Sequence, residues 1–456
     1  MSLASACTDS TGTAHPPPHV TAITVDSTAG PIFRSLVVTL QAPAAYRVDY
    51  WTGAAPRLRV ERSPGAATDS VFLPRLRPNV VYNFEVRTVA TDGRLGDPYR
   101  GTLTTDPLPI EFANLRFVAH GVPTLPLIML EVRTPGSATA FQGYVAVDGD
   151  GEVVWYWATI PEGFTRRANG NFVVLVSTQN APGRLVELRP DRREVRELAL
   201  DSGRVIHHDV VATPDNTLLF IEQETRVIND TAWTGEAVWE WHPESGLRTK
   251  RWSAFDFLMP DTDRGAYSVP TDWLHANSLS LGPRGNVVLS FPSLNQIVSI
   301  APGFGALEWR LGGPRATIAV PPEAAFSFEH SALEVTTDRV LLFDNGRGLP
   351  IGSRFSRGLE LHLDRVAGTA TRVWEFRPQP DIWAPIVGSV RRLVNGNTVV
   401  GFGVAPGFLQ ATGPIAAYEV TPSGRVVWDL HVEGTTVNYR ATPLTDIGGE
   451  RAVPEP

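Results

Sequence analysis

Cysteine is almost absent from this sequence: Cys7 is the only one among 456 residues. A single thiol cannot form a disulfide within the chain, and it leaves no cysteine cluster for a zinc site. Lysine is equally scarce, because Lys250 stands alone and all the other residues counted among the 40 lysines and arginines are arginine. Any one arginine, taken by itself, is therefore a weak indicator of function.

An excess of positive charge and long apolar runs are missing as well. The formal net charge is −8, so the chain lacks the basic surface by which proteins bind nucleic acids. No uninterrupted run of about 18 apolar residues occurs, and we therefore expect no membrane-spanning helix. Long amphipathic helical patterns are also lacking, which argues against α/β folds.

The chain begins with a short segment unlike the rest. Residues 1–18 are small, polar and end in prolines, which predicts a disordered tail. The segment Leu3-Ala4-Ser5-Ala6-Cys7 is similar to the end of a bacterial lipoprotein signal, in which the cysteine carries a lipid anchor. That interpretation predicts a periplasmic or extracellular protein anchored through Cys7. A free cysteine in a disordered tail is the alternative.

Residues 19–107 contain short alternating strands without helical periodicity, which predicts a small β-sandwich. Within it, residues 76–86 resemble the tyrosine corner of fibronectin type III domains, where a tyrosine hydroxyl ties a loop to the backbone. Residues 104–109 form the expected linker, because their two prolines interrupt strand pairing. Residues 448–456 are expected to be a C-terminal tail.

Two patterns recur over residues 108–447. The first is a hairpin with a tight turn, and the second is a short valine-rich strand ending in tryptophan, as in Gly151-Glu152-Val153-Val154-Trp155. About six such units of roughly 40 to 70 residues, each with four short strands, are typical of a six-bladed β-propeller. We expect 437–444 to supply the sixth inner strand and the early part of the domain to supply its outer partners. The predicted fold is all-β, with a small sandwich before the propeller.

Histidines stand where inner strands begin, and in a propeller these starts converge on the central axis. The four are His207, His208, His275 and His330. Asn277 shares a face with His275, since residues two apart on a strand point the same way. By the same rule only one of His207 and His208 faces the axis, and the sequence does not say which.

Carboxylates lie close to these histidines in the sequence, at Asp209, Asp272 and Glu329. A carboxylate that accepts the Nδ1 proton fixes the tautomer of an imidazole. Adjacent side chains on a strand point apart, so a partner from another blade is the alternative. The sequence therefore predicts carboxylate-oriented histidines.

Long insertions flank the histidine hairpins and carry several aromatic residues, as loops that form lids or binding sites often do. They are Phe255, Phe257, Tyr267, Trp273, Phe326, Phe328 and Trp383. An aromatic-walled mouth above a polar histidine centre suits a flat ring that bears an anionic group. Trp273 is the aromatic that we expect to contact substrate.

Four motifs together resemble those of the bacterial arylsulfate sulfotransferases. In chain order they are His207-His208-Asp209, Asp272-Trp273-Leu274-His275-Ala276-Asn277-Ser278, Trp309-Arg310-Leu311-Gly312-Gly313, and His330 followed by Phe343-Asp344-Asn345-Gly346. That family is a six-bladed propeller with an N-terminal β-domain, and it moves a sulfuryl group from one phenol to another without a nucleotide donor. The resemblance implies an aryl sulfate donor, a phenolic acceptor, and no cofactor or metal.

The resemblance also implies roles for individual residues. His330 would attack sulfur and hold a transient sulfohistidine, and His275 would act on the phenolic oxygen as acid and then as base. Asn277 and one of His207 and His208 would bind sulfate oxygens, with Ser389 as a further hydroxyl contact.

One family residue is missing: Pro292 stands where the family carries an arginine that binds sulfate. Arg391, Arg166 and Arg310 are the candidates to replace it, and Arg391 is the one we expect to contact substrate.

Three other functions remain open from the sequence. The same histidines could serve a hydrolase of sulfate, phosphate or related esters, with water as acceptor. Converging imidazoles could instead bind zinc or copper. Loss of the arginine at Pro292 is also compatible with a propeller that binds ligands without catalysis. The oligomeric state stays open.

Overall fold

A computed structural model describes residues 16–53, 56–178, 181–201 and 203–454. These residues form β-strands and short 3-10 helices, without an α-helix among them, so the all-β prediction is confirmed. The 3-10 helices are η1 (Ile110–Phe112), η2 (Ala254–Asp256), η3 (Pro322–Ala324) and η4 (Phe408–Gln410). Within the described ranges, no helix has the length and apolar character needed to cross a membrane. Cys7 lies outside the described residues.

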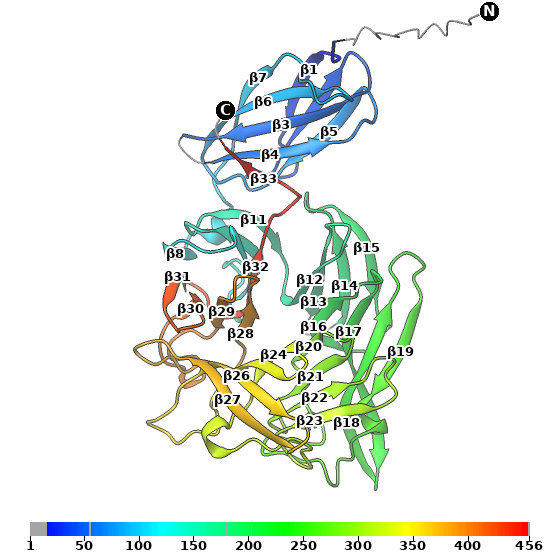
Figure 1. Ribbon diagram of the computed structural model, residues 1–456, viewed down its shortest axis with the longest axis vertical. Helices are drawn as coiled ribbons and strands as arrows, with labels where there is room; N and C mark the ends of the chain where they lie inside the picture. Colours follow the sequence, from blue (N-terminus) through cyan, green and yellow to red (C-terminus); the bar gives the residue numbers. More distant parts are fainter. Residues whose placement is uncertain (1–15, 54–55, 179–180, 202, 455–456) are drawn as a thin grey trace, which may run out of the picture. The chain divides into compact units, whose positions relative to one another are not determined.

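The chain divides into two compact units, one of Met1–Pro107 with Gly449–Pro456 and one of Leu108–Gly448. In the first unit, two antiparallel sheets form a sandwich (Figure 1). One sheet has the order β1 (Val20–Asp26), β2 (Arg34–Leu40), β5 (Thr68–Leu73). The other has the order β33 (Arg451–Val453), β4 (Arg57–Arg62), β3 (Ala45–Trp51), β6 (Val81–Val89), β7 (Tyr99–Thr104).

Strand β33 corrects the expectation of a tail at 448–456. Ala452 pairs with Leu58 of β4, so the end of the chain adds an edge strand to the larger sheet of the first unit. Periodicity could not indicate this strand, because three residues are too few to show alternation. The tyrosine-corner contact is present, since the Tyr82 hydroxyl accepts a hydrogen bond of 2.9 Å from the Arg77 amide. The relation to fibronectin type III domains stays a prediction.

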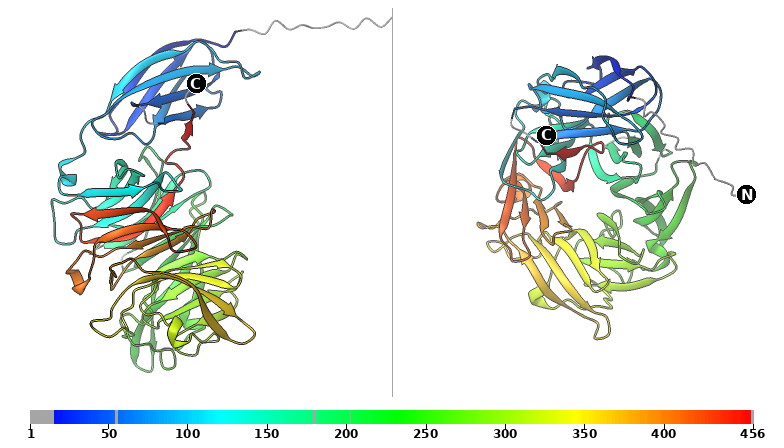
Figure 2. Two further views of the ribbon diagram at one scale, coloured as in Figure 1. Left: turned by 60° about the vertical axis from the view of Figure 1, so that its left-hand side comes forward. Right: turned by 45° about the horizontal axis from the view of Figure 1, so that its top comes forward.

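The second unit consists, over its described residues, of six antiparallel sheets arranged in a ring, so the predicted six-bladed propeller is confirmed (Figure 2). We number the blades 1 to 6 and give each from its inner strand outward. Blade 1 is β32 (Val437–Leu444), β9 (Leu127–Arg133), β10 (Gly143–Asp148), β11 (Val153–Ala158); blade 2 is β12 (Pro161–Arg166), β13 (Phe172–Thr178), β14 (Ala181–Leu188), β15 (Glu194–Ala199); blade 3 is β16 (Ile206–Ala212), β17 (Leu218–Ile228), β18 (Thr231–Trp241), β19 (Arg248–Ser253). Blade 4 is β20 (Ser278–Leu281), β21 (Val287–Phe291), β22 (Gln296–Ile300), β23 (Leu307–Leu311); blade 5 is β24 (His330–Thr336), β25 (Arg339–Asp344), β26 (Arg357–Asp364), β27 (Thr369–Phe376); blade 6 is β28 (Ser389–Arg392), β29 (Thr398–Phe402), β30 (Ile415–Val420), β31 (Val426–Glu433), β8 (Arg116–Gly121).

Both ends of the propeller domain take part in closing the ring. The C-terminal β32 is the inner strand of blade 1, as expected, and pairs with β9 from the start of the domain. Strand β8, which precedes β9, pairs instead with β31 and becomes the fifth strand of blade 6. Two strand pairings between distant parts of the chain therefore fasten blades 1 and 6.

The hydrophobic cores lie between successive blades. In β21, Val287 and Leu289 face a core shared with blade 3, whereas Val288 faces a core shared with blade 5. Both faces of such a strand are buried, which explains why the middle strands are almost uninterrupted runs of valine and leucine. The blades are thus held by side-chain packing, and the first residues of the inner strands are left for polar groups.

Candidate active site

The inner strands are irregular where they enter the propeller. In β16, His207 pairs with Ile221 and the next pair is Val210 with Phe220, so His208 and Asp209 bulge out of the ladder. The pairing of β24 shifts in the same region, between His330 and Leu333, and that of β32 between Asn438 and Ala441. β-Bulges re-aim side chains and are frequent beside active sites.

The bulge in β16 brings its two histidines into contact, whereas alternation along a regular strand would turn them apart. His208 has a φ of +64°, a left-handed conformation that residues with a side chain adopt rarely. The His207 and His208 Nδ1 atoms lie 2.5 Å apart. The His208 ring also lies 4.9 Å from the His275 ring, between centroids. The two neighbouring histidines of this strand therefore lie in contact, and His208 also contacts His275.

His275 is oriented by Asp272, as the sequence predicted. The His275 Nδ1 atom lies 2.6 Å from the Asp272 carboxylate, within the loop that precedes β20. His275 has a φ of +57°. Its side chain is 31% exposed, so the Nε2 side of a histidine already held by a carboxylate remains open to a substrate. A histidine arranged in this way can serve as a general acid or base.

His330 is oriented by an amide instead of the neighbouring acid. Its Nδ1 atom lies 2.8 Å from Oδ1 of Asn345, whose Nδ2 group donates to the carbonyls of Ala384 and Val387. The Val387 amide donates to the His330 Nε2 atom at 3.2 Å. Both contacts require the proton on Nδ1, which leaves the lone pair on Nε2. The expected partner Glu329 lies against Ser290.

Burial keeps these imidazoles neutral. It lowers the pKa of His330 to about 3, against the opposing effect of the Asn345 hydrogen bond. Burial, with the nearby His275, also lowers the pKa of His207 to about 3. The pKa of His208 falls well below its usual value for the same reasons, burial first and His207 second. A neutral His330 is a competent nucleophile throughout the physiological pH range.

Arg440, which the sequence analysis did not single out as a site residue, links three inner strands. Its guanidinium donates to the backbone carbonyls of His208 and Asn277, at 2.9 Å and 3.1 Å. The same guanidinium lies 3.0 Å from the Asp209 carboxylate. Asp209, expected beside a histidine, accepts instead from the Leu279 amide and pairs with this arginine. Arg440 therefore fixes the backbone that carries the histidines.

The remaining predicted contacts are deeply buried. Asn277 donates from Nδ2 to the Glu329 carbonyl, and its buried Oδ1 has no hydrogen-bond partner among the described residues. Ser389 accepts from the Ala441 amide and so joins blade 6 to blade 1. In this position Ser389 serves the packing of strands.

Most of the aromatics expected at the mouth belong to the cores. Trp273 is fully buried against Phe255 and donates its indole N–H to the Asp263 carbonyl at 2.6 Å. We therefore no longer count it among the substrate contacts. Phe328 lies beside His275 and His330, and Tyr267 packs against Phe328. An aromatic residue in a long loop can pack into a core or line the mouth of the site, and the sequence alone did not tell these two cases apart.

Two of the three arginines considered as replacements at Pro292 are engaged elsewhere. Arg166 bonds to Asp446 and to the Ile447 carbonyl, and Arg310 is buried against Asp263. Among the described residues, the Arg391 side chain donates only to the carbonyl of its neighbour Val390. Burial first, and then the charge of Arg440, lower its pKa. Of the three arginines, Arg391 is the one without a carboxylate partner among the described residues.

No group of three or more histidine, cysteine, aspartate or glutamate side chains in the described part of the chain is arranged to hold a metal ion. The histidine Nδ1 atoms are instead turned toward Asp272, toward Asn345 and toward each other. This geometry favours acid, base and nucleophile roles.

A buried carboxylate below the His275 loop gives a prediction on stability. Glu236 accepts from the Ala276 amide, and burial, with nearby Asp272, raises its pKa from 4.5 to about 8. The folded chain thus binds the proton more tightly than the unfolded chain, so Glu236 stabilises the fold below pH 4.5 and loses this effect as pH rises to 8. Each pH unit in that window changes stability by about 1.4 kcal/mol.

We therefore expect Glu236→Gln to become more stable relative to the wild type as pH rises from 5 to 8. Denaturant titrations at four pH values measure the difference. A difference that stays constant with pH, or that moves in favour of the wild type, contradicts the protonated state of Glu236.

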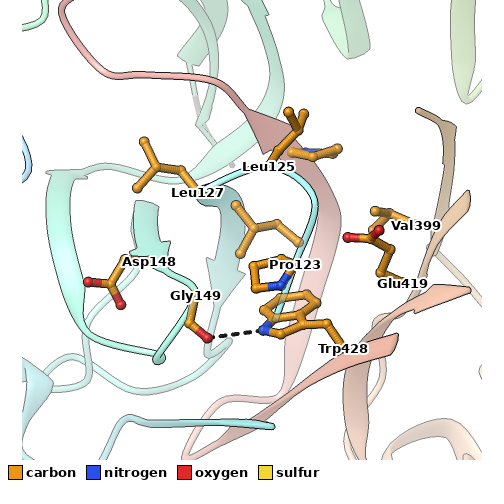
Figure 3. Close-up of a pocket in the computed structure, with 10 residues that line it drawn as sticks. Pro123, Leu125, Leu127, Asp148, Gly149, Val399, Glu419 and Trp428 are labelled. Atoms are coloured by element: carbon orange, nitrogen blue, oxygen red, sulfur yellow. Dashed lines mark hydrogen bonds between the residues drawn. The ribbon is translucent and has the colours of Figure 1, made fainter. Parts of the chain in front are cut away.

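A separate small pocket lies at the seam between blades 1 and 6 (Figure 3). Its carboxylates are already bonded, since Glu419 accepts from Thr124 and Asn397 and Asp148 accepts from the Glu152 amide. The Trp428 indole donates to the Gly149 carbonyl across the seam. None of the four histidines lines this pocket, so we assign it to ring closure.

Comparisons with known proteins bear on these residues. A family model described as Arylsulfotransferase (ASST) matches residues 115–440, a stretch that includes the four histidines and Arg440. A comparison with curated sequences found no match.

Solved structures with similar folds are distant. A protein of unknown function from Bacteroides caccae has 14% identity over 70% of this chain and 99% of its own, with a TM-score of 0.46. A virginiamycin B lyase from Staphylococcus aureus has 13% identity over 88% of this chain and 99% of its own, with a TM-score of 0.35. A periplasmic gluconolactonase from Pseudomonas aeruginosa has 14% identity over 87% and 98%, with a TM-score of 0.39. We rest no argument on these likenesses.

Proposed function

Because this chain belongs to the arylsulfotransferase (ASST) family, we propose that it transfers a sulfuryl group from an aryl sulfate to a phenol through a sulfohistidine on His330. The observation that carries the proposal is the tautomer of His330, which Asn345 and Val387 fix from opposite sides of the ring. Burial and these two contacts keep the imidazole neutral, with its lone pair on Nε2.

In the first half-reaction, the Nε2 lone pair of His330 attacks the sulfur of the donor and forms the N–S bond. The S–O bond to the aryl group breaks, and the phenolate oxygen takes a proton from His275, whose Nδ1 side is held by Asp272. The Nδ1–H of His330 stays bonded to Asn345, which stabilises the positive charge that the ring acquires. The long Val387 contact to Nε2 opens in this step.

The second half-reaction runs the same chemistry in reverse. An acceptor phenol replaces the first product and gives its proton to the now neutral His275 while its oxygen attacks sulfur. The N–S bond breaks and its electron pair returns to Nε2 of His330. Because one histidine serves as acid and then as base, the two substrates use one pocket in turn.

The sulfuryl oxygens need hydrogen-bond donors other than His330 and His275, which take part in making and breaking bonds. We assign one of these contacts to Arg391, whose guanidinium is not paired with a carboxylate of the described residues, in place of the arginine missing at Pro292. We assign the remaining contacts to His207, His208 and Asn277. Donors placed where charge develops on the trigonal-bipyramidal sulfur give the largest single catalytic effect in such sites.

Hydrolysis of the same ester is the second candidate function. The observation that favours it is the exposure of His275, through which water could reach the sulfohistidine.

Export to the periplasm or beyond stays a prediction from the sequence around Cys7.

The test is release of nitrophenol from 4-nitrophenyl sulfate by the full chain, with and without added phenol. We expect release that phenol stimulates, with phenyl sulfate as the second product. Release that is unaffected by phenol, with free sulfate as product, would establish the hydrolase instead. Absence of release with a panel of aryl sulfates would refute both.

A further inference from the structure

Phe328 lies directly beside both proposed reacting histidines. Its ring centroid is 6.1 Å from that of His275 and 6.0 Å from that of His330. Its carbonyl faces the His330 Nδ1 atom at 3.2 Å. The backbone of Phe328 has a φ of +57°, which an aromatic residue adopts only when its surroundings enforce it. The Phe328 ring is therefore held in place as a wall of the site.

Arg347 lies over this wall. Its guanidinium carbon is 4.0 Å from the centroid of Phe328 and 5.0 Å from that of Tyr267. Arg347 is half-buried, and its guanidinium forms no hydrogen bond or ion pair with another described residue. Arg440, by contrast, is paired with the Asp209 carboxylate.

We propose that Arg347, with Tyr267 and Phe328, forms a subsite for a second anionic group on the aromatic substrate, a ring carboxylate or sulfonate away from the reacting oxygen. This deepens the proposed function and rests on it. The phenol ring packs against Phe328 with its oxygen at His275, and the far substituent reaches the guanidinium. A guanidinium binds carboxylate and sulfonate through paired hydrogen bonds.

The reach of the arrangement fits such a substrate. The guanidinium carbon of Arg347 lies 4.0 Å and the His330 ring 6.0 Å from the same Phe328 centroid, so a group bound to Arg347 lies about one substituted ring away from the reacting centre. A guanidinium that only packed on Phe328 would also satisfy the contacts, since cation–π pairs are worth about 0.5–1 kcal/mol at exposed sites. The two roles predict different effects of removing the Arg347 charge. Only loss of an anion-binding arginine weakens the binding of anionic ligands while leaving that of neutral ligands unchanged.

A matched arginine exists in the same loop. Arg354 lies 4.4 Å from the ring of Trp383 and donates to the Leu349 carbonyl. Arg354 and Arg347 thus make the same kind of ring contact, but only the second contacts an aromatic residue beside the histidines. Arg354→Met controls for the loss of a cation–π contact in this loop.

The experiment measures equilibrium binding of 4-hydroxybenzoate and of uncharged 4-hydroxybenzyl alcohol by calorimetry, without a sulfate donor. We expect the wild type to bind the carboxylate more tightly, Arg347→Met to lose about tenfold or more for that ligand alone, and Arg354→Met to match the wild type. Equal losses for both ligands, or no loss for the carboxylate, overturn the inference.

The same ligands then serve as acceptors with phenyl sulfate as donor. We expect Arg347→Met to raise KM for 4-hydroxybenzoate with little change in kcat, since the contact is made equally in ground and transition states. An inactive wild type that still binds the carboxylate through Arg347 would refute the proposed reaction and leave the subsite standing. A wild type that is active but binds the carboxylate no more tightly than the alcohol would refute the subsite and leave the proposed reaction standing.

Discussion

His330→Ala should form no sulfuryl adduct and should transfer sulfuryl groups roughly 10,000-fold more slowly than the wild type, or slower still. The reason is that the variant lacks the imidazole whose Nε2 lone pair makes the proposed attack, and whose tautomer two hydrogen bonds fix. Loss of a nucleophile that works as part of a unit typically costs this much or more. Intact-mass spectrometry after brief mixing with 4-nitrophenyl sulfate measures the adduct, and nitrophenol absorbance measures the rate in the same tube.

His362→Ala is the matched control. His362 lies on β26 of the same blade, with a side chain that is 41% exposed and paired with Asp338. We expect this variant to keep both the adduct and the rate. An adduct that persists in His330→Ala would place the covalent step on another side chain, and His208 would be the first to examine because its ring is the one in contact with His275.

Arg440→Met should lower the free energy of unfolding by about 3–5 kcal/mol, the usual cost of removing one partner of a buried ion pair. The substitution leaves Asp209 buried without its cation and removes the donors to the His208 and Asn277 carbonyls. Glu131, buried nearby with neither carboxylate oxygen hydrogen-bonded to another described residue, also loses its main favourable charge. Denaturant titration measures the effect, and transfer should fall with it because three strands lose their common anchor.

A double variant separates charge from packing in this prediction. Arg440→Met combined with Asp209→Asn should be more stable than Arg440→Met alone, by about 1–2 kcal/mol, because the uncompensated carboxylate is gone. Arg62→Met, which removes an exposed pair with Asp69, should cost less than about 1 kcal/mol. Equal stabilities of the single and double variants would show that the Asp209 charge is not what Arg440 balances.

The hairpins and the histidines were predictable because their signals are local. Tight turns between runs of valine mark a strand pair, and equivalent positions in successive pairs must converge in a propeller. The pairing of His275 with Asp272 was also within reach, since both belong to one loop.

What the sequence did not reveal depends on contacts between blades. The contact between His207 and His208 arises from a bulge, and alternation along a regular strand predicts the contrary. Arg440 meets Asp209 only after the ring closes, so no spacing in the chain connects them. A signal was nevertheless present: Arg440 lies in an inner strand, at the level where other blades place histidines. Trp273 was expected at the mouth of the site, but the loop that carries it is packed into a core.

Closure of the ring by β32 has a consequence for biosynthesis. The ribosome makes β9 more than 300 residues before its partner β32, and until then β9 presents an open edge to other chains. A nascent or truncated chain ending before Val437 would already contain all four histidines, but it would lack Arg440. The ring and the contact of Arg440 with Asp209 can thus form only after β32 has been made. We expect a chain released earlier to expose the β9 edge and to aggregate.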